Sequence, residues 1–173
     1  MDTKLIIKKA KPEDADILAK LGKRTFTEAY AGKIPKQALK KYVLGNFSHK
    51  AIALELALKN SSFSIAYKEK TPAGYSKINI SRNVHGEKDS RCSELERVYV
   101  LKEFQGQGIG NALLKKFEHA AKKRGNTFVW LGTWEKNKRS ISFYKRHGYT
   151  KFSSHTFAIG TIKQRDFLLK KSL

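Results

Sequence analysis

The chain has 173 residues and 40% hydrophobic residues, which suits one compact domain with a substantial core. The sequence contains no repeat, linker or shift in composition, so we expect a single domain over residues 1–173. The 36 Lys and Arg against 15 Asp and Glu give a formal charge of +21, which argues against an acidic or neutral surface. A field of this sign attracts polyanions and raises encounter rates with anionic ligands.

Nothing in the sequence indicates a membrane, disulfide or metal protein. No apolar run reaches the roughly 18 residues of a membrane span, and residues 1–4 lack the start of a signal peptide. We therefore expect a cytoplasmic protein with no membrane partner. The single cysteine, Cys92, excludes an internal disulfide, and the five histidines show no metal-ligand spacing, so we expect no metal. A packed Cys92 thiol is favoured over a nucleophile.

The strong positive charge also suggests a nucleic-acid-binding module that uses non-specific phosphate contacts. The basic residues, however, are spread along the whole chain, without a zinc-finger, RRM or KH motif. A solvated basic surface is the favoured interpretation, and nucleic acid stays open as an alternative partner.

The first half of the chain predicts one strand, a set of helices and then a hairpin. Pro12 followed by acidic residues suits the first turn of a helix, and Ser48 is a good N-cap. The predicted elements are a strand at 5–8, helices beginning at 12, 35 and 49, hairpin strands at 62–67 and 74–80, and a polar loop at 83–93.

The second half predicts two strand–helix units followed by two strands. The predicted elements are a strand at 95–100, a helix from 109 to about 123 ended by Gly125, a strand at 127–132 buried on both faces, a loop at 134–137, a helix at 138–147, and strands at 152–159 and 166–170. Asn137 can cap the second helix, and Gly148 can end it in a Schellman-like close. This order predicts a mixed sheet with helices on both faces.

The strand at 95–100 leads into a glycine-rich turn. Strict alternation places Glu94, Glu96, Val98 and Val100 on one face of the strand, and Leu95, Arg97, Tyr99 and Leu101 on the other. The glycines at 106, 108 and 110 let a ligand approach free N–H groups at a helix start, which favours an anion such as a pyrophosphate. A Rossmann site is excluded, because position 111 is Asn and no acid lies about 20 residues further on.

The segment from Gln105 to Gly110 fits the pattern Q/R-x-x-G-x-G/A and resembles the acetyl-CoA loop of the GNAT N-acetyltransferases. The resemblance implies the GNAT fold, an α/β (α+β) fold with a central mixed, largely antiparallel sheet of six to seven strands and helices on both faces. It implies acetyl-CoA as cosubstrate, bound by the backbone of these residues: Val98, Val100, Gln105, Gly106, Gln107, Gly108, Ile109 and Gly110.

A second segment, from Asn137 to Tyr149, is similar to the GNAT pattern N-x-x-A-x-x-F-Y-x-x-x-G-F, with Ser140 and Tyr149 as mild departures. The resemblance implies that Asn137 contacts CoA and that Tyr144 stands near the thioester sulfur. On a helix Phe143 points about 100° away from Tyr144, so one aromatic can pack while the other faces a cleft.

Acetyl transfer to an amine demands two proton movements. An alkyl amine with a pKa of about 10.4 is neutral in only about one molecule in a thousand at pH 7.4, a penalty of roughly 4 kcal/mol. Glu96 is the candidate base, directly or through water, and an outward salt-bridging glutamate is the alternative. Tyr144 is the candidate acid for the leaving thiolate, and the resemblance implies that a strand amide near Val100 stabilises the oxyanion.

The segments 25–30, 95–100 and 130–137 resemble the PaiA-type spermidine/spermine acetyltransferases, which implies a polyamine acceptor. A +21 protein repels a polycation, so such a site needs a local acidic cluster. The available acids are Glu28, Glu94, Glu96 and Glu135. If they do not converge, another amine, such as a protein N-terminus or a lysine, is the expected acceptor. A nonenzymatic nucleic-acid-binding regulator is the remaining alternative, and a homodimer is left open.

Overall fold

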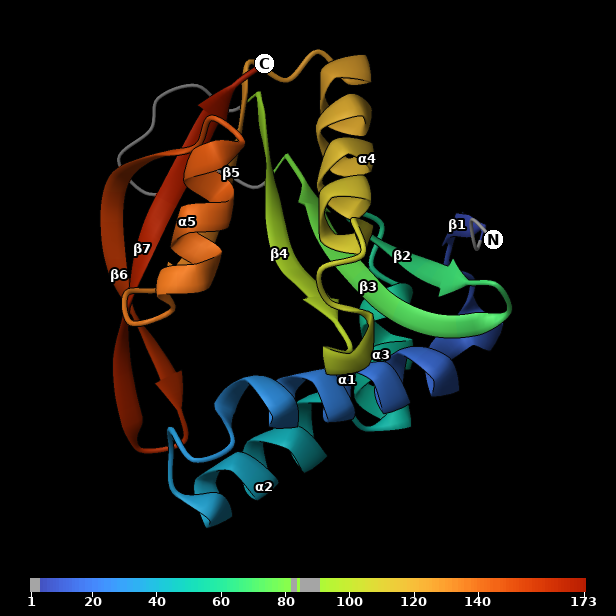
Figure 1. Ribbon diagram of the computed structural model, residues 1–173, viewed down its shortest axis with the longest axis vertical. Coiled ribbons are helices and arrows are strands. Elements are labelled where there is room, and N and C mark those ends of the chain that lie inside the picture. Colours follow the sequence, from blue (N-terminus) through green and yellow to red (C-terminus); the bar gives the residue numbers. More distant parts are fainter. Residues whose placement is uncertain (1–3, 82–83, 85–90) are drawn as a thin grey trace.

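This computed structural model describes residues 4–81, 84 and 91–173. Over these residues the chain forms a seven-stranded mixed sheet with strand order β1-β2-β3-β4-β5-β7-β6 (Figure 1). The strands are β1 (Leu5–Lys9), β2 (Ser61–Lys68), β3 (Thr71–Ile80), β4 (Cys92–Val100), β5 (Phe128–Trp134), β6 (Thr150–Ile159) and β7 (Ile162–Ser172). Strands β4 and β5 pair in parallel and the other neighbours are antiparallel, which confirms the predicted α/β class and mixed, largely antiparallel sheet.

Helices cover both faces of the sheet, as predicted. The helices are α1 (Ala15–Tyr30), α2 (Lys36–Asn46), α3 (His49–Leu56), α4 (Ile109–Lys123) and α5 (Lys138–Arg146). The first three pack on one face, here called the α1 face, around a core that includes Leu18, Ile52 and Tyr75. Helices α4 and α5 pack on the opposite face, here called the α4 face, around Leu95 and Phe117 (Figure 1).

Local signals in the sequence set the ends of these helices. The Ser48 hydroxyl accepts a hydrogen bond from the Ala51 N–H at 3.2 Å, so Ser48 caps α3 as predicted. At the end of α5, Gly148 has a φ of 86° and the Tyr149 N–H donates to the Tyr144 carbonyl at 3.1 Å. Together with the bond from the Gly148 N–H to the Lys145 carbonyl, this is the predicted Schellman close.

The predicted alternation along β4 is wrong beyond Glu96, because the strand contains a β-bulge. Leu95 pairs with Ile78 and Arg97 pairs with Lys77, so Glu96 is an extra residue in the ladder. Glu96 and Arg97 consequently both lie on the α1 face.

The bulge also moves the rest of the strand to the opposite face from the predicted one. Val98 and Val100 turn to the α4 face, where Val98 packs in the same cluster as Leu95. Glu96 is therefore separated from the two valines with which strict alternation had grouped it.

Several boundaries differ from the predicted ones by a few residues. Residues 12–14 form a 3-10 turn before α1, and β5 continues through Trp134, which was predicted to lie in a loop. The polar loop predicted at 83–93 falls largely outside the described residues, and its last part, from Cys92, begins β4. Cys92 is fully buried, which supports a packed thiol rather than a nucleophile.

Two further features concern the described residues alone. None of the helices in residues 4–81, 84 and 91–173 is both long and apolar enough to span a bilayer. In the same residues, no three His, Cys, Asp or Glu side chains gather in a way that would hold a metal ion.

Candidate active site

The parallel pairing of β4 with β5 is short, and beyond it the two strands separate. The pairing covers residues 92–94 of β4 and 128–130 of β5, whereas the strands run on to Val100 and Trp134 (Figure 1). We call the unpaired region between residues 95–100 and 131–134 the splay. It is the place where backbone groups inside the sheet have no neighbouring strand to bond.

Backbone N–H and carbonyl groups of β4 point into the splay. The Leu101 N–H donates to the Ala73 carbonyl on the β3 side at 2.9 Å, so the N–H and carbonyl of Val100 point the other way, into the splay. By the same alternation those of Val98 also point there. The Val100 carbonyl accepts a hydrogen bond from the Gln105 side-chain amide at 3.0 Å, which ties the following loop to the end of the strand.

The glycine loop presents free N–H groups beside the splay. Gly106 and Gly108 both have a φ of 81°, and Gly108 is the N-cap of α4. The first intrahelical bond runs from the Ala112 N–H to the Gly108 carbonyl at 3.0 Å, so the preceding N–H groups of the first turn point outward. A Cβ placed on Gly106 or Gly108 would meet nothing within 4 Å, which leaves open space for an anion at the positive end of the helix.

Replacing Gly108 with Ala is expected to destabilise the protein by about 1–2 kcal/mol, because a Cβ is unfavourable in the left-handed conformation. Gly110 is the matched control, since its φ is not positive and an added Cβ would lie 3.9 Å from the Phe143 ring, an ordinary contact. Urea unfolding of Gly108→Ala and Gly110→Ala measures the difference. Equal losses in the two variants would contradict the assignment of strain to Gly108.

Helix α5 is joined to the glycine loop and to α4 by long-range polar contacts. Arg139 Nη1 donates to Gln105 Oε1 at 2.8 Å, across 34 positions of sequence. Near the other end of α5, His147 Nε2 lies 3.0 Å from Asn111 Oδ1. Arg139 and His147 were not predicted as site residues, because no spacing rule links residues on separate helices.

Tyr144 lies on the buried side of α5. The residue is 7% exposed and packs edge-to-face on Phe143 at 5.2 Å and on Tyr149 at 5.7 Å. Burial raises the pKa of its phenol well above the ordinary value. Its hydroxyl forms no hydrogen bond within the described residues, whereas the half-buried Phe143 lies against the helix start at Gly110. Tyr144 therefore keeps its proton at neutral pH.

Glu96 belongs to a charge cluster on the α1 face, made of Glu55, Lys77, Glu94, Glu96 and Arg97. Its carboxylate accepts from Lys77 Nζ at 2.9 Å and from Asn79 Nδ2 at 2.6 Å, and Arg97 Nη2 lies 3.2 Å away. The same Asn79 amide donates to Glu94 at 2.7 Å. The structure therefore brings Glu94 and Glu96 together, and Glu96 is paired inside the fold rather than outward.

The cationic neighbours decide the ionisation of Glu96. Burial is the largest influence and acts to raise the pKa of the carboxyl group, but the charges of Arg97 and Lys77 and the hydrogen bonds from Lys77 and Asn79 together outweigh it. The net effect is a lowered pKa. Glu96 is therefore a carboxylate at neutral pH.

The lowered pKa of Glu96 predicts a loss of stability in acid. Its paired carboxylate stabilises the fold at every pH above the unfolded pKa of about 4.3, and this contribution is lost as the pH falls through the lower folded value. Urea unfolding between pH 7 and pH 3 should therefore show a smaller acid-induced loss in Glu96→Gln than in the wild type. Glu13→Gln, at an exposed position, should keep the wild-type acid sensitivity. Identical pH profiles for all three proteins would refute this.

A second polar group lies on the α1 face at the far side of the splay, made of Tyr30, Trp134, Gln164 and Asp166. Asp166 pairs with Trp134 across β5 and β7, and the Trp134 ring stacks on Tyr30 at 5.8 Å. Gln164 Nε2 donates to Asp166 Oδ1 at 2.9 Å, while Gln164 Oε1 is buried with no hydrogen-bond partner among the described residues. We call this set the Asp166 group.

Burial is the main reason that the pKa of Asp166 is raised above its ordinary value. The side chain is 13% exposed, so a cation that reached it would be largely withdrawn from water. The Asp166 group was not predicted, because its acid and amide lie on the last strand, away from both motifs.

The remaining predicted residues lie on other elements. Glu28 accepts from the Lys102 N–H at 2.9 Å and pairs with Arg24 at 3.1 Å, past the end of β4. Glu135 follows β5 and its charge acts on Asp166. The Asn137 side chain caps α5 by accepting from the Ser140 N–H at 3.1 Å. The four predicted acids therefore do not form one cluster, although Glu94 joins Glu96 and Glu135 lies near the Asp166 group.

Known proteins with similar sequences are acetyltransferases. The profile described as "Acetyltransferase (GNAT) family" matches residues 33–149. An uncharacterised N-acetyltransferase from Lactobacillus delbrueckii subsp. lactis is 31% identical over 153 residues, 88% of each chain. A spermidine N(1)-acetyltransferase from Thermoplasma acidophilum is 24% identical over 147 residues, 83% of this chain and 86% of that one.

Among solved structures, the PaiA N-acetyltransferase from Thermoplasma acidophilum in complex with coenzyme A superposes with a TM-score of 0.82. The match covers 98% of this chain and 99% of that one at 22% sequence identity. At this identity the likeness establishes a common fold.

Proposed function

Because the chain belongs to the GNAT family of acetyltransferases, we propose that it transfers the acetyl group of acetyl-CoA to a primary amine of a polyamine such as spermidine. One observation carries the proposal: the splay has an anion-binding glycine loop on the α4 face and carboxylates on the α1 face. Such a sheet can receive an anionic cosubstrate from one side and a cationic acceptor from the other.

The residues around the splay fit acetyl-CoA. The backbone N–H groups of residues 105–110 would hold the pyrophosphate, since Gly106 and Gly108 leave their surroundings open. The backbone of Val98 and Val100 would bind the acyl end, and Asn137 would contact the cosubstrate from the start of α5. When bound, acetyl-CoA supplies an acyl carbon activated as a thioester.

Glu96 and Tyr144 are the proposed proton carriers. An ammonium acceptor must lose a proton before it can attack, and the Glu96 carboxylate is the proposed base. Its lowered pKa keeps Glu96 ionised and also makes it a weak base. Because Lys77, Asn79 and Arg97 already bond this carboxylate, transfer through water is favoured over direct contact. The raised pKa of Tyr144 keeps a proton on its hydroxyl for the leaving sulfur, and the Val100 N–H points into the splay as an oxyanion donor.

The four acids predicted from the sequence do not converge, which taken alone favours an amine other than a polyamine. The Asp166 group, which the sequence did not predict, supplies a separate acidic site and supports a polyamine as the acceptor. A second ammonium of the acceptor would find the Asp166 carboxylate, the unpartnered Gln164 Oε1 and the stacked ring faces of Tyr30 and Trp134. Glu135 adds a further negative charge nearby. These local acids offset the repulsion expected from the overall charge of +21. The Thermoplasma relative named as a spermidine acetyltransferase points the same way.

The test is to mix the protein with acetyl-CoA and spermidine, spermine, a lysine-bearing peptide or no acceptor, and to follow release of free CoA thiol. We expect spermidine-dependent release, with the KM for spermidine raised about tenfold in Asp166→Asn, since an amine–carboxylate contact contributes about 1.4 kcal/mol or more. Asp16→Asn is the matched control, because Asp16 lies exposed on α1 and pairs with His49.

The outcomes separate the alternatives. Release with the peptide alone would keep the acetyltransferase and discard the polyamine in favour of a protein amine. A Michaelis constant unchanged in Asp166→Asn would remove the Asp166 group from acceptor binding. No release with any acceptor, together with no rise in melting temperature on adding acetyl-CoA, would discard the enzyme and favour the nucleic-acid-binding regulator.

A further inference from the structure

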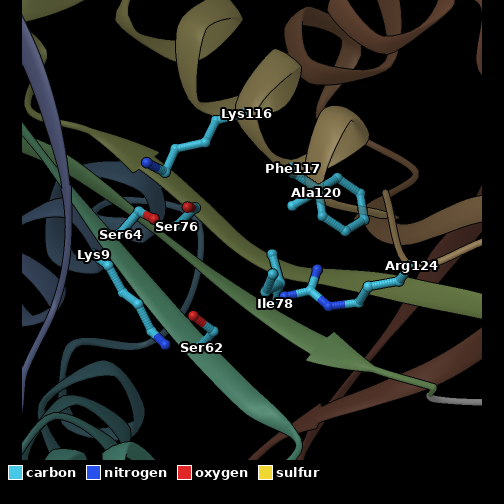
Figure 2. A pocket seen from close by; sticks show the side chains of 9 residues that line it. All are labelled: Lys9, Ser62, Ser64, Ser76, Ile78, Lys116, Phe117, Ala120 and Arg124. Carbon is cyan, nitrogen blue, oxygen red and sulfur yellow. The ribbon is translucent and has the colours of Figure 1, made fainter. Parts of the chain in front are cut away.

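A basic hollow lies on the α4 face, between α4 and the first three strands of the sheet. Its volume is about 190 Å³, and side chains from β1, β2, β3 and α4 gather around it (Figure 2). The lining residues are Lys9, Ser62, Ser64, Ser76, Ile78, Lys116, Phe117, Ala120 and Arg124. Its polar side chains come from β1, β2, β3 and α4, whereas the splay lies between β4 and β5.

The sheet supplies a polar row to this hollow. Lys9 pairs with Ser64 across β1 and β2, and Ser64 pairs with Ser76 across β2 and β3, so one cation and two hydroxyls lie side by side. One step further along the same face, the row is Ile7 and Ala66, which pack in an apolar cluster with Leu113 of α4. The face therefore changes from apolar to polar under the second half of α4.

The helix supplies two more cations at matching positions. Lys116 and Ala120 of α4 and Arg124, the C-cap of that helix, are spaced by four and follow one stripe along it. The small Ala120 stands between the two long basic side chains and leaves room, while the buried Ile78 and Phe117 form an apolar base. In Figure 2, Arg124 extends toward Ile78 of β3, and Lys116 extends from the helix over Ser76 of β3 and Ser64 of β2.

The charge of the hollow is unbalanced. It has three cations and three hydroxyls in its lining and no carboxylate. Within the described part of the chain, none of Lys9, Lys116 and Arg124 forms an ion pair, whereas Lys77 and Arg97 in the charge cluster are fully paired. Lys116 Nζ donates to the Ile7 carbonyl at 3.5 Å, which leaves its charge without a carboxylate partner. Cations of this kind beside hydroxyl donors can bind a phosphate group.

A second hollow, of about 500 Å³, shares Lys9 and Ser62 with the first and adds Lys11 and Lys59. It also has no carboxylate in its lining, although Glu13 lies 3.6 Å from Lys11. The basic surface therefore continues past Lys9, which gives room for more than one phosphate group.

We propose that this hollow binds a small phosphorylated ligand bearing two or more phosphate groups, at a site separate from the glycine loop. A single-stranded nucleic acid is disfavoured, because binding of that kind uses exposed aromatic rings to stack bases. The rings that line the two hollows, Phe63 and Phe117, are 1% and 2% exposed. The hydroxyls and cations can bond phosphate oxygens.

The proposal is tested by calorimetric titration of the full chain with tripolyphosphate at low ionic strength. The double variant Lys116→Gln/Arg124→Gln should bind about tenfold or more weakly, because two charge-assisted contacts are lost. The matched control is Lys115→Gln/Lys122→Gln, which removes the same charge from exposed positions of the same helix outside the hollow. Its affinity should stay within about twofold of the wild type, since only screened long-range charge is lost.

Three results would overturn the proposal. Equal weakening in the two double variants would show that only net charge matters. Displacement of tripolyphosphate by acetyl-CoA would place the probe at the glycine loop. If an oligothymidylate binds, loses affinity in Lys116→Gln/Arg124→Gln, and tripolyphosphate does not bind, the surface is a nucleic-acid site. Two results together support the proposal. Tripolyphosphate binding should be unchanged when acetyl-CoA is present, and it should be weakened in Lys116→Gln/Arg124→Gln but not in Lys115→Gln/Lys122→Gln. If Ser76→Ala also weakens tripolyphosphate binding, by less than Lys116→Gln/Arg124→Gln does, the buried Ser76 hydroxyl belongs to the site.

Discussion

Replacing Tyr144 with Phe is expected to lower kcat for acetyl transfer by about 10²-fold or more, the usual contribution of a positioned general acid. The fold should be unaffected, because the substitution keeps the ring that packs on Phe143 and Tyr149, and the Tyr144 hydroxyl forms no hydrogen bond within the described residues. The measurement is spermidine-dependent release of CoA thiol, with melting temperature and acetyl-CoA affinity recorded for the same samples.

Tyr149→Phe is the matched control for this substitution. Tyr149 is 1% exposed and lies 5.7 Å from Tyr144, so both variants remove one hydroxyl from the same buried cluster. The proposed role requires a rate loss in Tyr144→Phe that Tyr149→Phe does not share. If both variants keep the wild-type rate, Tyr144 is a core aromatic and the leaving group takes its proton from elsewhere.

Replacing Arg97 with Leu is expected to destabilise the protein by about 3–5 kcal/mol, because removing one partner of a buried ion pair leaves the other charge uncompensated. The Arg97 guanidinium is 12% exposed and bonds Glu55 through both of its terminal nitrogens at 2.8 Å. Its loss would leave Glu55 and Glu96 sharing Lys77 alone. Urea unfolding at pH 7 measures the change.

Two controls isolate the buried pair. Arg24→Leu removes an arginine that is 55% exposed, although it also forms ion pairs, and should cost about 1 kcal/mol or less. The double variant Glu55→Gln/Arg97→Leu should lose less stability than the sum of the two single variants, since each single change leaves an unpaired charge. Additive losses would mean that Glu55 and Arg97 do not stabilise each other.

Signals that act within one turn of chain predicted most of the fold. The Ser48 and Asn137 caps and the Gly148 close lie where the sequence places them, because each depends on residues no more than about five positions apart. The parallel β4–β5 pairing could also be predicted, since a strand–helix–strand unit demands a crossover.

The parts that could not be predicted depend on distant residues. The bulge at Glu96 is visible only in the pairing with β3, and it reverses the faces of Val98 and Val100. Likewise, the contact of Arg139 with Gln105 and that of Gln164 with Tyr30 join positions 34 and 134 residues apart. A motif fixes which residues are near the loop, but it does not say which distant side chains complete the site.

The brief β4–β5 pairing has a consequence for the cooperativity of the fold. The sheet consists of two antiparallel halves, β1–β4 and β5–β7. Among the described residues, the strand pairing that joins them covers only residues 92–94 and 128–130, and one further backbone bond runs from the Thr127 N–H to the Arg91 carbonyl at 2.8 Å. A ligand in the splay would touch both halves at once and act as a clamp between them. Amide hydrogen exchange in the two halves should therefore slow together when acetyl-CoA binds, including at strands far from the ligand.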